Sequence, residues 1–124
     1  MDSVNFFVPR IPPSPNKLHG QNWRMRFREK HTWIVELQVG AGREKIQQLR
    51  EWHEVSRLRV EMIIHHSRLF DPDNLVSCAK VPLDAAKWLG FITDDSSKWI
   101  ELHVSQVKSS RKEARTEFRL SRIA

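Results

Sequence analysis

The chain has 124 residues, the length of a single domain, and a domain of this size buries enough apolar surface to fold without disulfide bonds or a structural metal. Lysine and arginine total 21 against 15 aspartate and glutamate residues, so the formal charge is +6 and the pI is near 10.0. This excess favours an anionic partner such as nucleic acid, but a soluble basic protein without such a partner fits the charge alone equally well. We expect one domain over residues 1–124.

The cysteine count and the apolar runs limit the compartment. Cys78 is the only cysteine, so no intrachain disulfide can form, and no Cys/His spacing resembles a zinc site. Nowhere do 18 apolar residues run together, and the apolar run at the N-terminus is too short for a signal peptide. We therefore expect a cytoplasmic protein with no membrane partner.

Strand and helix periods succeed each other in the first half of the chain. Residues 3–8 alternate apolar and polar side chains and predict a strand. Helical spacing follows over residues 22–39, and good helix formers over 43–53 predict a second helix after the stop signals Gly40 and Gly42. The apolar stripe expected on the first helix comprises Trp23, Phe27, Ile34 and Leu37.

The second half predicts a strand, a helix and two further strands. Alternation with a period of two is clearest over residues 58–64, and helical spacing returns over 75–86, with a break at Pro82 and a stop at Gly90. The last two strands are expected over residues 100–104 and 114–120. This order predicts an α/β fold, a small mixed β-sheet of about four strands with helices packed on it.

Two acids follow the strand that ends near residue 64. In Phe70-Asp71-Pro72-Asp73-Asn74, Asp71 precedes a proline and is therefore expected to be extended. Because alternate side chains of an extended chain share a face, Asp71 and Asp73 are predicted to point the same way and together to hold a Mg²⁺ ion. One alternative makes Asp73 the N-cap of the next helix, and another makes the segment a surface turn.

A second acidic pair, Asp94-Asp95, follows one helix-length later. A short return through residues 91–93 would bring it back to the sheet beside the first pair, whereas the alternative is an ordinary polar turn. Acids clustered in a basic chain are typical of a metal-dependent nuclease, because carboxylates hold Mg²⁺ while the cationic surroundings bind the polyanion.

Two histidines and the cysteine are expected to have structural roles and not catalytic ones. His65 and His66 are neighbours on a strand, so they face opposite sides and cannot jointly chelate one ion. Cys78 lies on the apolar side of its helix and is expected to be a small core residue rather than a nucleophile.

Basic residues are dense in residues 17–30 and again after residue 108. On two faces of one domain they could contact two nucleic-acid arms, although a solvated charge is the alternative for any single residue. Trp23 lies among them and could contact bases or sugars, while the other tryptophans are expected to anchor the core. The candidate DNA-contacting residues are Lys17, Trp23, Arg24, Arg26, Arg28, Lys30, Arg111 and Lys112.

Three motifs occur in a characteristic order along the chain. They are Ile11-Pro12-Pro13-Ser14-Pro15-Asn16-Lys17, Asp71-Pro72-Asp73-Asn74-Leu75 and Gly90-Phe91-Ile92-Thr93-Asp94-Asp95-Ser96. In this order they resemble the RusA family of Holliday junction resolvases, small nucleases that are frequent in phages and prophages. The similarity runs over most of the chain.

The resemblance implies a homodimer that binds four-way DNA junctions and makes two symmetric cuts with Mg²⁺, or with Mn²⁺ as a substitute. The family's metal-binding acids match Asp71, Asp73 and Asp95, with Asp94 as a weaker fourth. A family lysine that is important for activity falls on Ser77 in the shortest form of the motif. Lys80 is expected to replace it, because it precedes Asp84-Ala85 by the family's interval and lies nearly one helical turn further on.

The leading hypothesis is therefore a Mg²⁺-dependent, structure-specific endodeoxyribonuclease that resolves Holliday junctions in DNA recombination or repair. In this hypothesis, Lys80 stabilises phosphate charge in the transition state. One alternative is a non-catalytic protein that binds branched DNA, with its acids serving as caps and turns. Another is a nuclease for a different structured nucleic acid, such as flaps or RNA.

Overall fold

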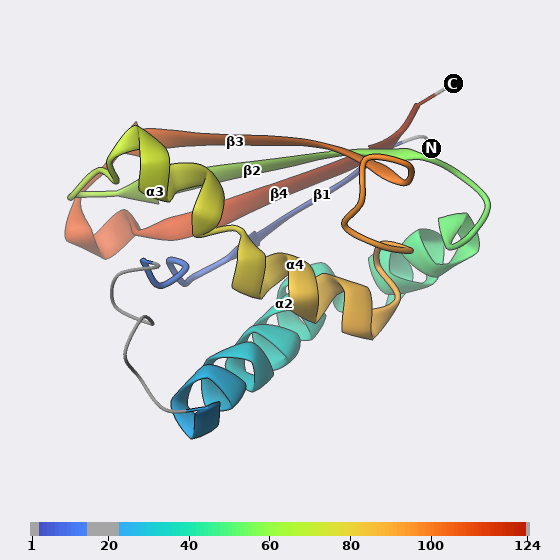
Figure 1. The fold of residues 1–124 in the computed structure, drawn as a ribbon, viewed down its shortest axis with the longest axis horizontal. Coiled ribbons are helices and arrows are strands. Elements are labelled where there is room, and N and C mark those ends of the chain that lie inside the picture. The colour runs from blue at the N-terminus through green and yellow to red at the C-terminus, as the bar shows by residue number, and fades with distance from the viewer. Residues whose placement is uncertain (1–2, 15–22, 124) are drawn as a thin grey trace.

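The computed structural model of the chain describes residues 3–14 and 23–123. In this part of the chain a four-stranded sheet is covered on one face by two helices, α2 and α4 (Figure 1). The elements are β1 (Ser3–Val8), α2 (Trp23–Trp52), β2 (Leu58–His66), α3 (Pro72–Ser77), α4 (Lys80–Leu89), β3 (Ile100–Lys108), the 3-10 helix η1 (Arg111–Glu113) and β4 (Arg115–Arg122). The predicted α/β class with a small mixed sheet is confirmed.

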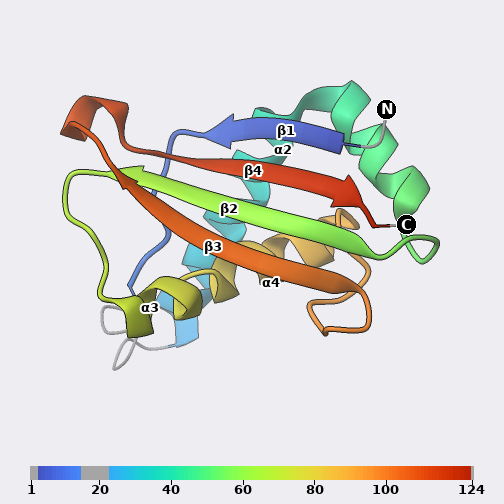
Figure 2. The same cartoon turned by 90° about the horizontal axis from the view of Figure 1, so that it is seen from above.

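The strand order in the sheet is β1-β4-β2-β3 (Figure 2). β4 lies between β1 and β2 and is antiparallel to both, whereas β2 and β3 are parallel. A parallel pair needs a long crossover connection, and the segment with α3 and α4 supplies it. β1, β2 and β3 therefore run in one direction, and the chain leaves all three at the same end of the sheet.

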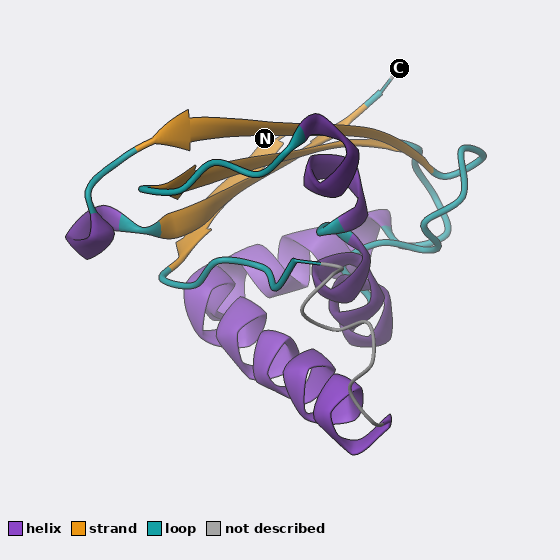
Figure 3. Cartoon of the chain, turned by 60° about the vertical axis from the view of Figure 1, so that its left-hand side comes forward, coloured by secondary structure: helices purple, strands orange, loops and turns teal. Residues whose placement is uncertain are grey.

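The core lies between the sheet and the two long helices (Figure 3). Alternate residues of β1 and β2 are buried because period-two side chains share the face that the helices cover. Phe6 stacks on Phe118 across β1 and β4 with ring centroids 5.3 Å apart. From the helices, the core receives Trp33, Ile34, Leu37, Leu49, Leu83 and Leu89.

The helix α2 contains the predicted break. Gly42 has φ 79° and ψ 165°, so the 30-residue element is two helices joined by a kink. Gly40 serves another purpose, because a Cβ at this position would lie 2.6 Å from the carbonyl oxygen of Phe7 on β1. Glycine thus lets the helix approach the strand closely. Within the described residues no helix is both long enough and apolar enough to cross a membrane.

The apolar stripe predicted for α2 is correct only in part. Ile34 and Leu37 are buried, but Trp23 and Phe27 are 66% and 65% exposed. The physical reason is geometric: the first turns of α2 extend away from the sheet, so helical spacing continues where there is no core to cover (Figure 1). Of the tryptophans expected to anchor the core, Trp88 is also exposed, at 67%.

The crossover helix divides in two, as predicted, but the division lies at residues 78–79 and not at Pro82. α3 ends at Ser77 and α4 begins at Lys80, two residues before Pro82, which is compatible with the first turn of a helix. Gly90 ends α4 in the left-handed conformation, with φ 79°, as its sequence position predicts.

Candidate active site and nucleic-acid interface

The segment that leads to Asp71 is tied to β3 by one side chain. The Phe70 N–H donates a hydrogen bond to Oε1 of Gln106 at 2.8 Å, and Nε2 of Gln106 donates to the Phe70 carbonyl oxygen at 2.9 Å. A primary amide that satisfies both backbone groups of one residue acts like a neighbouring strand. Gln106 therefore fixes the backbone immediately before Asp71.

Asp71 is the N-cap residue of α3. Its backbone is extended, with φ −64° and ψ 149°, as its place before Pro72 predicts. Its carbonyl oxygen accepts hydrogen bonds from the N–H groups of Asn74 at 2.9 Å and Leu75 at 3.0 Å. The Asp71 side chain makes no capping hydrogen bond, so its carboxylate accepts none of the N–H groups at the start of α3. The alternative that made Asp73 the N-cap is wrong.

Asp73 lies in the first turn of α3, so the prediction that Asp71 and Asp73 share one face of an extended segment is also wrong. Proline fixes φ near the helical value and is preferred at the first helical position, so the helix starts at Pro72 and not after Asp73. The Ser77 hydroxyl donates to the Asp73 carbonyl oxygen at 3.3 Å, which ties that serine to its own helix.

Lys80, the first residue of α4, contacts two acids. Its Nζ lies 3.2 Å from Oδ1 of Asp84, one turn along the helix, and 3.6 Å from Oδ2 of Asp95, which follows α4. The hydrogen bond that Lys80 donates to Asp84 and the negative charge of Asp84 raise the pKa of Lys80, and the Asp95 carboxylate adds to the effect. Lys80 is therefore a firmly protonated cation beside a motif acid.

Asp94 is directed to a different lysine. Its Oδ1 lies 2.9 Å from Nζ of Lys87, and this hydrogen bond lowers the pKa of Asp94 and raises that of Lys87. Adjacent in sequence, Asp94 and Asp95 thus contact lysines about two helical turns apart on α4. Asp94 fits the polar-turn alternative, because its carboxylate forms a solvent-exposed ion pair with Lys87.

The predicted acids have the oxygen donors that Mg²⁺ prefers, but they do not form one cluster. Across residues 3–14 and 23–123, no group of three or more His, Cys, Asp or Glu side chains is placed to hold a metal ion. Asp71 and Asp95 line two different hollows. The described side chains therefore do not form a three-acid metal centre.

The larger hollow is a cleft of about 800 Å³ between α2 and the crossover helices. One wall comes from the first turns of α2 and the other from α3 and α4, with Asp95 and Leu102 completing it. The residues of this cleft that carry charge are Arg26, Lys30, Lys80, Asp84 and Asp95. Ser77 lines the same cleft, so both candidates for the family lysine position face the same space.

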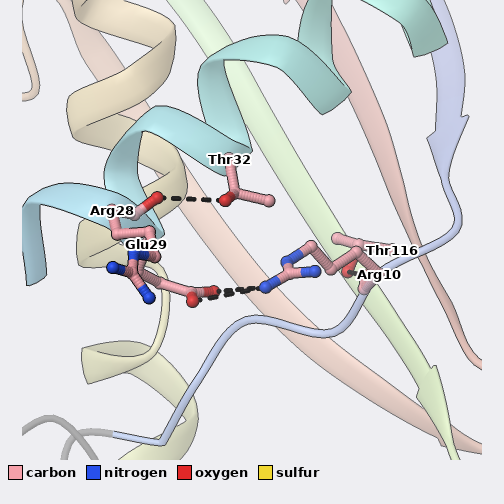
Figure 4. Close-up of polar contacts among 5 residues, drawn as sticks. All are labelled: Arg10, Arg28, Glu29, Thr32 and Thr116. Carbon is pink, nitrogen blue, oxygen red and sulfur yellow. Dashed lines mark hydrogen bonds and ion pairs between the residues drawn. The ribbon is translucent and has the colours of Figure 1, made fainter. Parts of the chain in front are cut away.

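A second hollow of about 600 Å³ lies where the chain leaves β1 and β2. Its wall is braced by Arg10, whose Nη2 donates to both carboxylate oxygens of Glu29 on α2, at 3.1 and 3.2 Å (Figure 4). The buried Thr116 hydroxyl donates to the Arg10 carbonyl oxygen at 2.7 Å. Asp71 and Asn74 line this hollow together with Arg28 and Arg68. Sequence reasoning missed Arg10, which only its place directly after β1 could have suggested.

His66 ends the buried stripe of β2 and lines the second hollow, while His65 lies on the other face, as predicted. The His66 ring is 4.9 Å from the Phe70 ring, and its Nε2 is buried with no hydrogen-bond partner among the described residues. Burial lowers the pKa of His66, and a hydrogen bond with Gln106 partly opposes the shift. Cys78 is buried, as predicted, but it follows the last residue of α3 instead of lying within a helix, and burial raises the pKa of its thiol to about 11.

The candidate DNA-contacting residues lie at several places. Lys17 is outside the described residues. Arg26 and Lys30 line the cleft, Arg28 lines the second hollow, and the Arg24 guanidinium lies 5.6 Å from the centre of the Trp23 ring. Arg111 and Lys112 are exposed in η1, between β3 and β4. Three basic residues of α2 thus line the same hollows as two motif acids: Arg26 and Lys30 with Asp95, and Arg28 with Asp71.

Comparison with protein-family models gave no match, and a search of the curated proteins found no significant relative. The family resemblance consequently depends on the three ordered motifs of the sequence, and its functional content is a proposal.

Proposed function

We propose that the protein is a structure-specific endodeoxyribonuclease of the RusA type, which resolves four-way DNA junctions with Mg²⁺ as its cofactor. The observation that carries the proposal is the cleft between α2 and α4. It contains the motif acid Asp95 and Lys80, while α2 contributes Arg26 and Lys30 from the opposite wall. A polyanion entering such a cleft meets cations on both sides.

Lys80 is the residue best placed to act on phosphate charge. Its contacts with Asp84 and Asp95 keep it protonated and at the cleft, so the ammonium is pre-organised where negative charge would develop during hydrolysis. Ser77 has no charge and bonds its own helix. These contacts favour Lys80 over Ser77 as the equivalent of the family lysine.

Bound Mg²⁺ would supply a Lewis acid and an activated water. Asp71, Asp73 and Asp95 are the proposed ligands on the motif alone, because the described side chains form no three-acid group. The chain's own residues perform the remaining tasks. Gln106 fixes the backbone that carries Asp71, and Lys80 presents a positive charge beside Asp95.

A homodimer is part of the proposal. One domain of this size offers one such cleft and can hold one scissile phosphate, whereas resolving a junction needs paired cuts, which two-fold symmetry provides. Sedimentation velocity with and without a four-way junction tests this point. A monomer that stays monomeric on the junction and still makes both symmetric cuts would exclude the dimer.

The second candidate function is binding of branched DNA without cleavage, and the absence of a three-acid group among the described residues favours it. The two functions separate in one experiment. Purified protein is incubated with a labelled synthetic four-way junction and with a matched linear duplex, in Mg²⁺ and in EDTA. Paired cuts in the junction that need Mg²⁺ support the nuclease, and retention of intact junction in both buffers supports the binding protein.

A further inference from the structure

Three large aromatic side chains lie on the surface where α2 and α4 face solvent. Trp23 and Phe27 of α2 and Trp88 of α4 are each about two-thirds exposed. We name these three residues the aromatic face. Removing tryptophan and phenylalanine side chains from water lowers the free energy. Several such side chains exposed on one surface therefore mark a binding site for a ligand or a macromolecule.

The two helices bring two of these rings, Phe27 and Trp88, to one place, and Trp23 lies one helical turn before Phe27 on α2. A small hollow of about 100 Å³ is lined by Phe27, Lys30, His31, Ile34 and Trp88. Phe27 and Lys30 also line the large cleft, so the aromatic face continues into the cleft that contains Lys80 and Asp95. The His31 ring is nearly parallel to the Phe27 ring, with centroids 6.5 Å apart, which extends the flat surface along α2.

Cations accompany the rings. The Arg24 guanidinium lies over the Trp23 ring, 5.6 Å from its centre. Arg26 and Lys30, which line the cleft beside Phe27, form no ion pair with any described residue. Solvent-exposed rings beside unpaired positive charge match a ligand that combines flat aromatic groups with negative charge.

A second copy of the chain suits this surface poorly. In a two-fold interface the same patch meets itself, and the carboxylates of the cleft, Asp84 and Asp95, already pair with Lys80 and leave Arg26 and Lys30 without a partner across the interface. A nucleic-acid strand satisfies both features, because its bases stack on aromatic rings and its phosphates neutralise the cations. Paired bases already stack on one another, so only unpaired bases can use the rings.

We propose that the aromatic face binds unpaired bases of a DNA strand by stacking, with Arg26 and Lys30 contacting the flanking phosphates. The proposal deepens the proposed function, because it assigns the nuclease a preference for substrates whose strands open near the cleft. Binding of a single strand can be measured without any cleavage, so the two proposals fail separately.

The test measures the affinity of the protein for a short fluorescein-labelled oligothymidylate by anisotropy, in EDTA and at low salt. An abasic oligonucleotide of the same length serves as the control for charge alone. We expect the base-containing strand to bind more tightly than the abasic one and to change the fluorescence of the exposed tryptophans. Phe27→Leu and Trp88→Leu are each expected to weaken binding of the oligothymidylate about tenfold while leaving abasic binding unchanged.

Val39→Ala is the matched variant, because Val39 is an exposed apolar residue of α2 at 77% exposure that lines neither hollow of the aromatic face. It is expected to bind both strands like the unaltered protein. Circular dichroism checks that each variant is folded.

Two results overturn the proposal. One is equal affinity for the base-containing and abasic strands. The other is a Trp88→Leu variant that turns a dimer into a monomer and keeps its affinity for oligothymidylate, which would make the aromatic face a contact between copies. Junction cleavage is measured in parallel. Base-dependent binding without cleavage would support the stacking proposal and contradict the proposed nuclease function.

Discussion

The ammonium group of Lys80 lies 3.6 Å from the carboxylate of Asp95, although α4 and the turn after it separate the two residues. Asp84 contacts the same ammonium at 3.2 Å, so Lys80 bridges its own helix and the following turn. The bridge places a cation beside a motif acid in a cleft whose opposite wall is basic. The contact with Asp84 follows from helical spacing, whereas the contact with Asp95 depends on the tertiary structure.

Lys80→Ala is expected to slow junction cleavage strongly and to weaken junction binding only slightly, because a charge that acts on the transition state affects the chemical step more than ground-state affinity. The variant should remain stable, since an exposed ion pair contributes only about 0–1 kcal/mol. Single-turnover cleavage rates and gel mobility shifts measure the two effects. Ser77→Ala is the control and should do little; the reverse outcome would transfer the role to Ser77.

Asp73→Asn is expected to abolish cleavage while junction binding stays intact or tightens, because an amide is a poor metal ligand yet repels phosphate less. The cost to folding is small, about 0.3–1 kcal/mol, since Asp73 only favours the N-terminal end of a helix. Asp95→Asn should behave in the same way. Glu113→Gln is the control, because Glu113 lies in η1 and lines neither hollow; this variant should cleave the junction normally. Full cleavage by Asp73→Asn would exclude Asp73 as a metal ligand.

Gly40→Ala is expected to destabilise the protein by up to about 2 kcal/mol. Alanine gains about 1 kcal/mol of helix propensity over glycine, but overpacking costs about 1–3 kcal/mol, and here a backbone oxygen lies 2.6 Å from the added Cβ. Urea unfolding measures the change. Gln38→Ala, an exposed site on the same helix, should stay within about 0.5 kcal/mol. A stabilised Gly40→Ala would mean that β1 and α2 can separate without cost.

Cys78 is expected to react slowly with thiol reagents in the folded protein at pH 8, because the thiolate is the reactive form and burial raises the thiol pKa to about 11. In the unfolded chain the pKa returns to about 9.0, so the folded state holds its proton more firmly between these values. The contribution of Cys78 to stability is therefore lost as the pH rises through that range. Rapid labelling of the native protein would show that the thiol is accessible.

The stability of the folded state is expected to fall as the pH drops below 6.5, because the lowered pKa of His66 means that the unfolded chain binds the proton first. His66→Gln should flatten this part of the pH dependence. Asp94 and Glu101 are exposed carboxylates with lowered pKa values, so they change protonation at more acidic pH. Their titration therefore does not contribute to the change in stability just below pH 6.5. Thermal unfolding between pH 5 and pH 8 measures the difference, and identical profiles would exclude His66 as its source.

Local sequence determined those features that depend on a few neighbouring residues. Period-two alternation placed β1, β2 and β4, and the glycines at 42 and 90 broke or ended their helices where predicted. Pro72 made Asp71 extended, because the ring of a proline restricts the residue before it. The same proline started α3 earlier than expected and so corrected the placement of Asp73.

The tertiary structure decided which distant residues meet. Lys80 and Asp95, Arg10 and Glu29, and Gln106 and Phe70 are pairs whose partners lie on different elements. Likewise, helical periodicity alone assigned Trp23 and Phe27 to the core, whereas the first turns of α2 extend away from the sheet and leave both side chains exposed (Figure 1). Periodicity reports which side chains share a face, but burial depends on what packs against that face, and this is fixed only when strands distant in sequence pair and orient the helices above them.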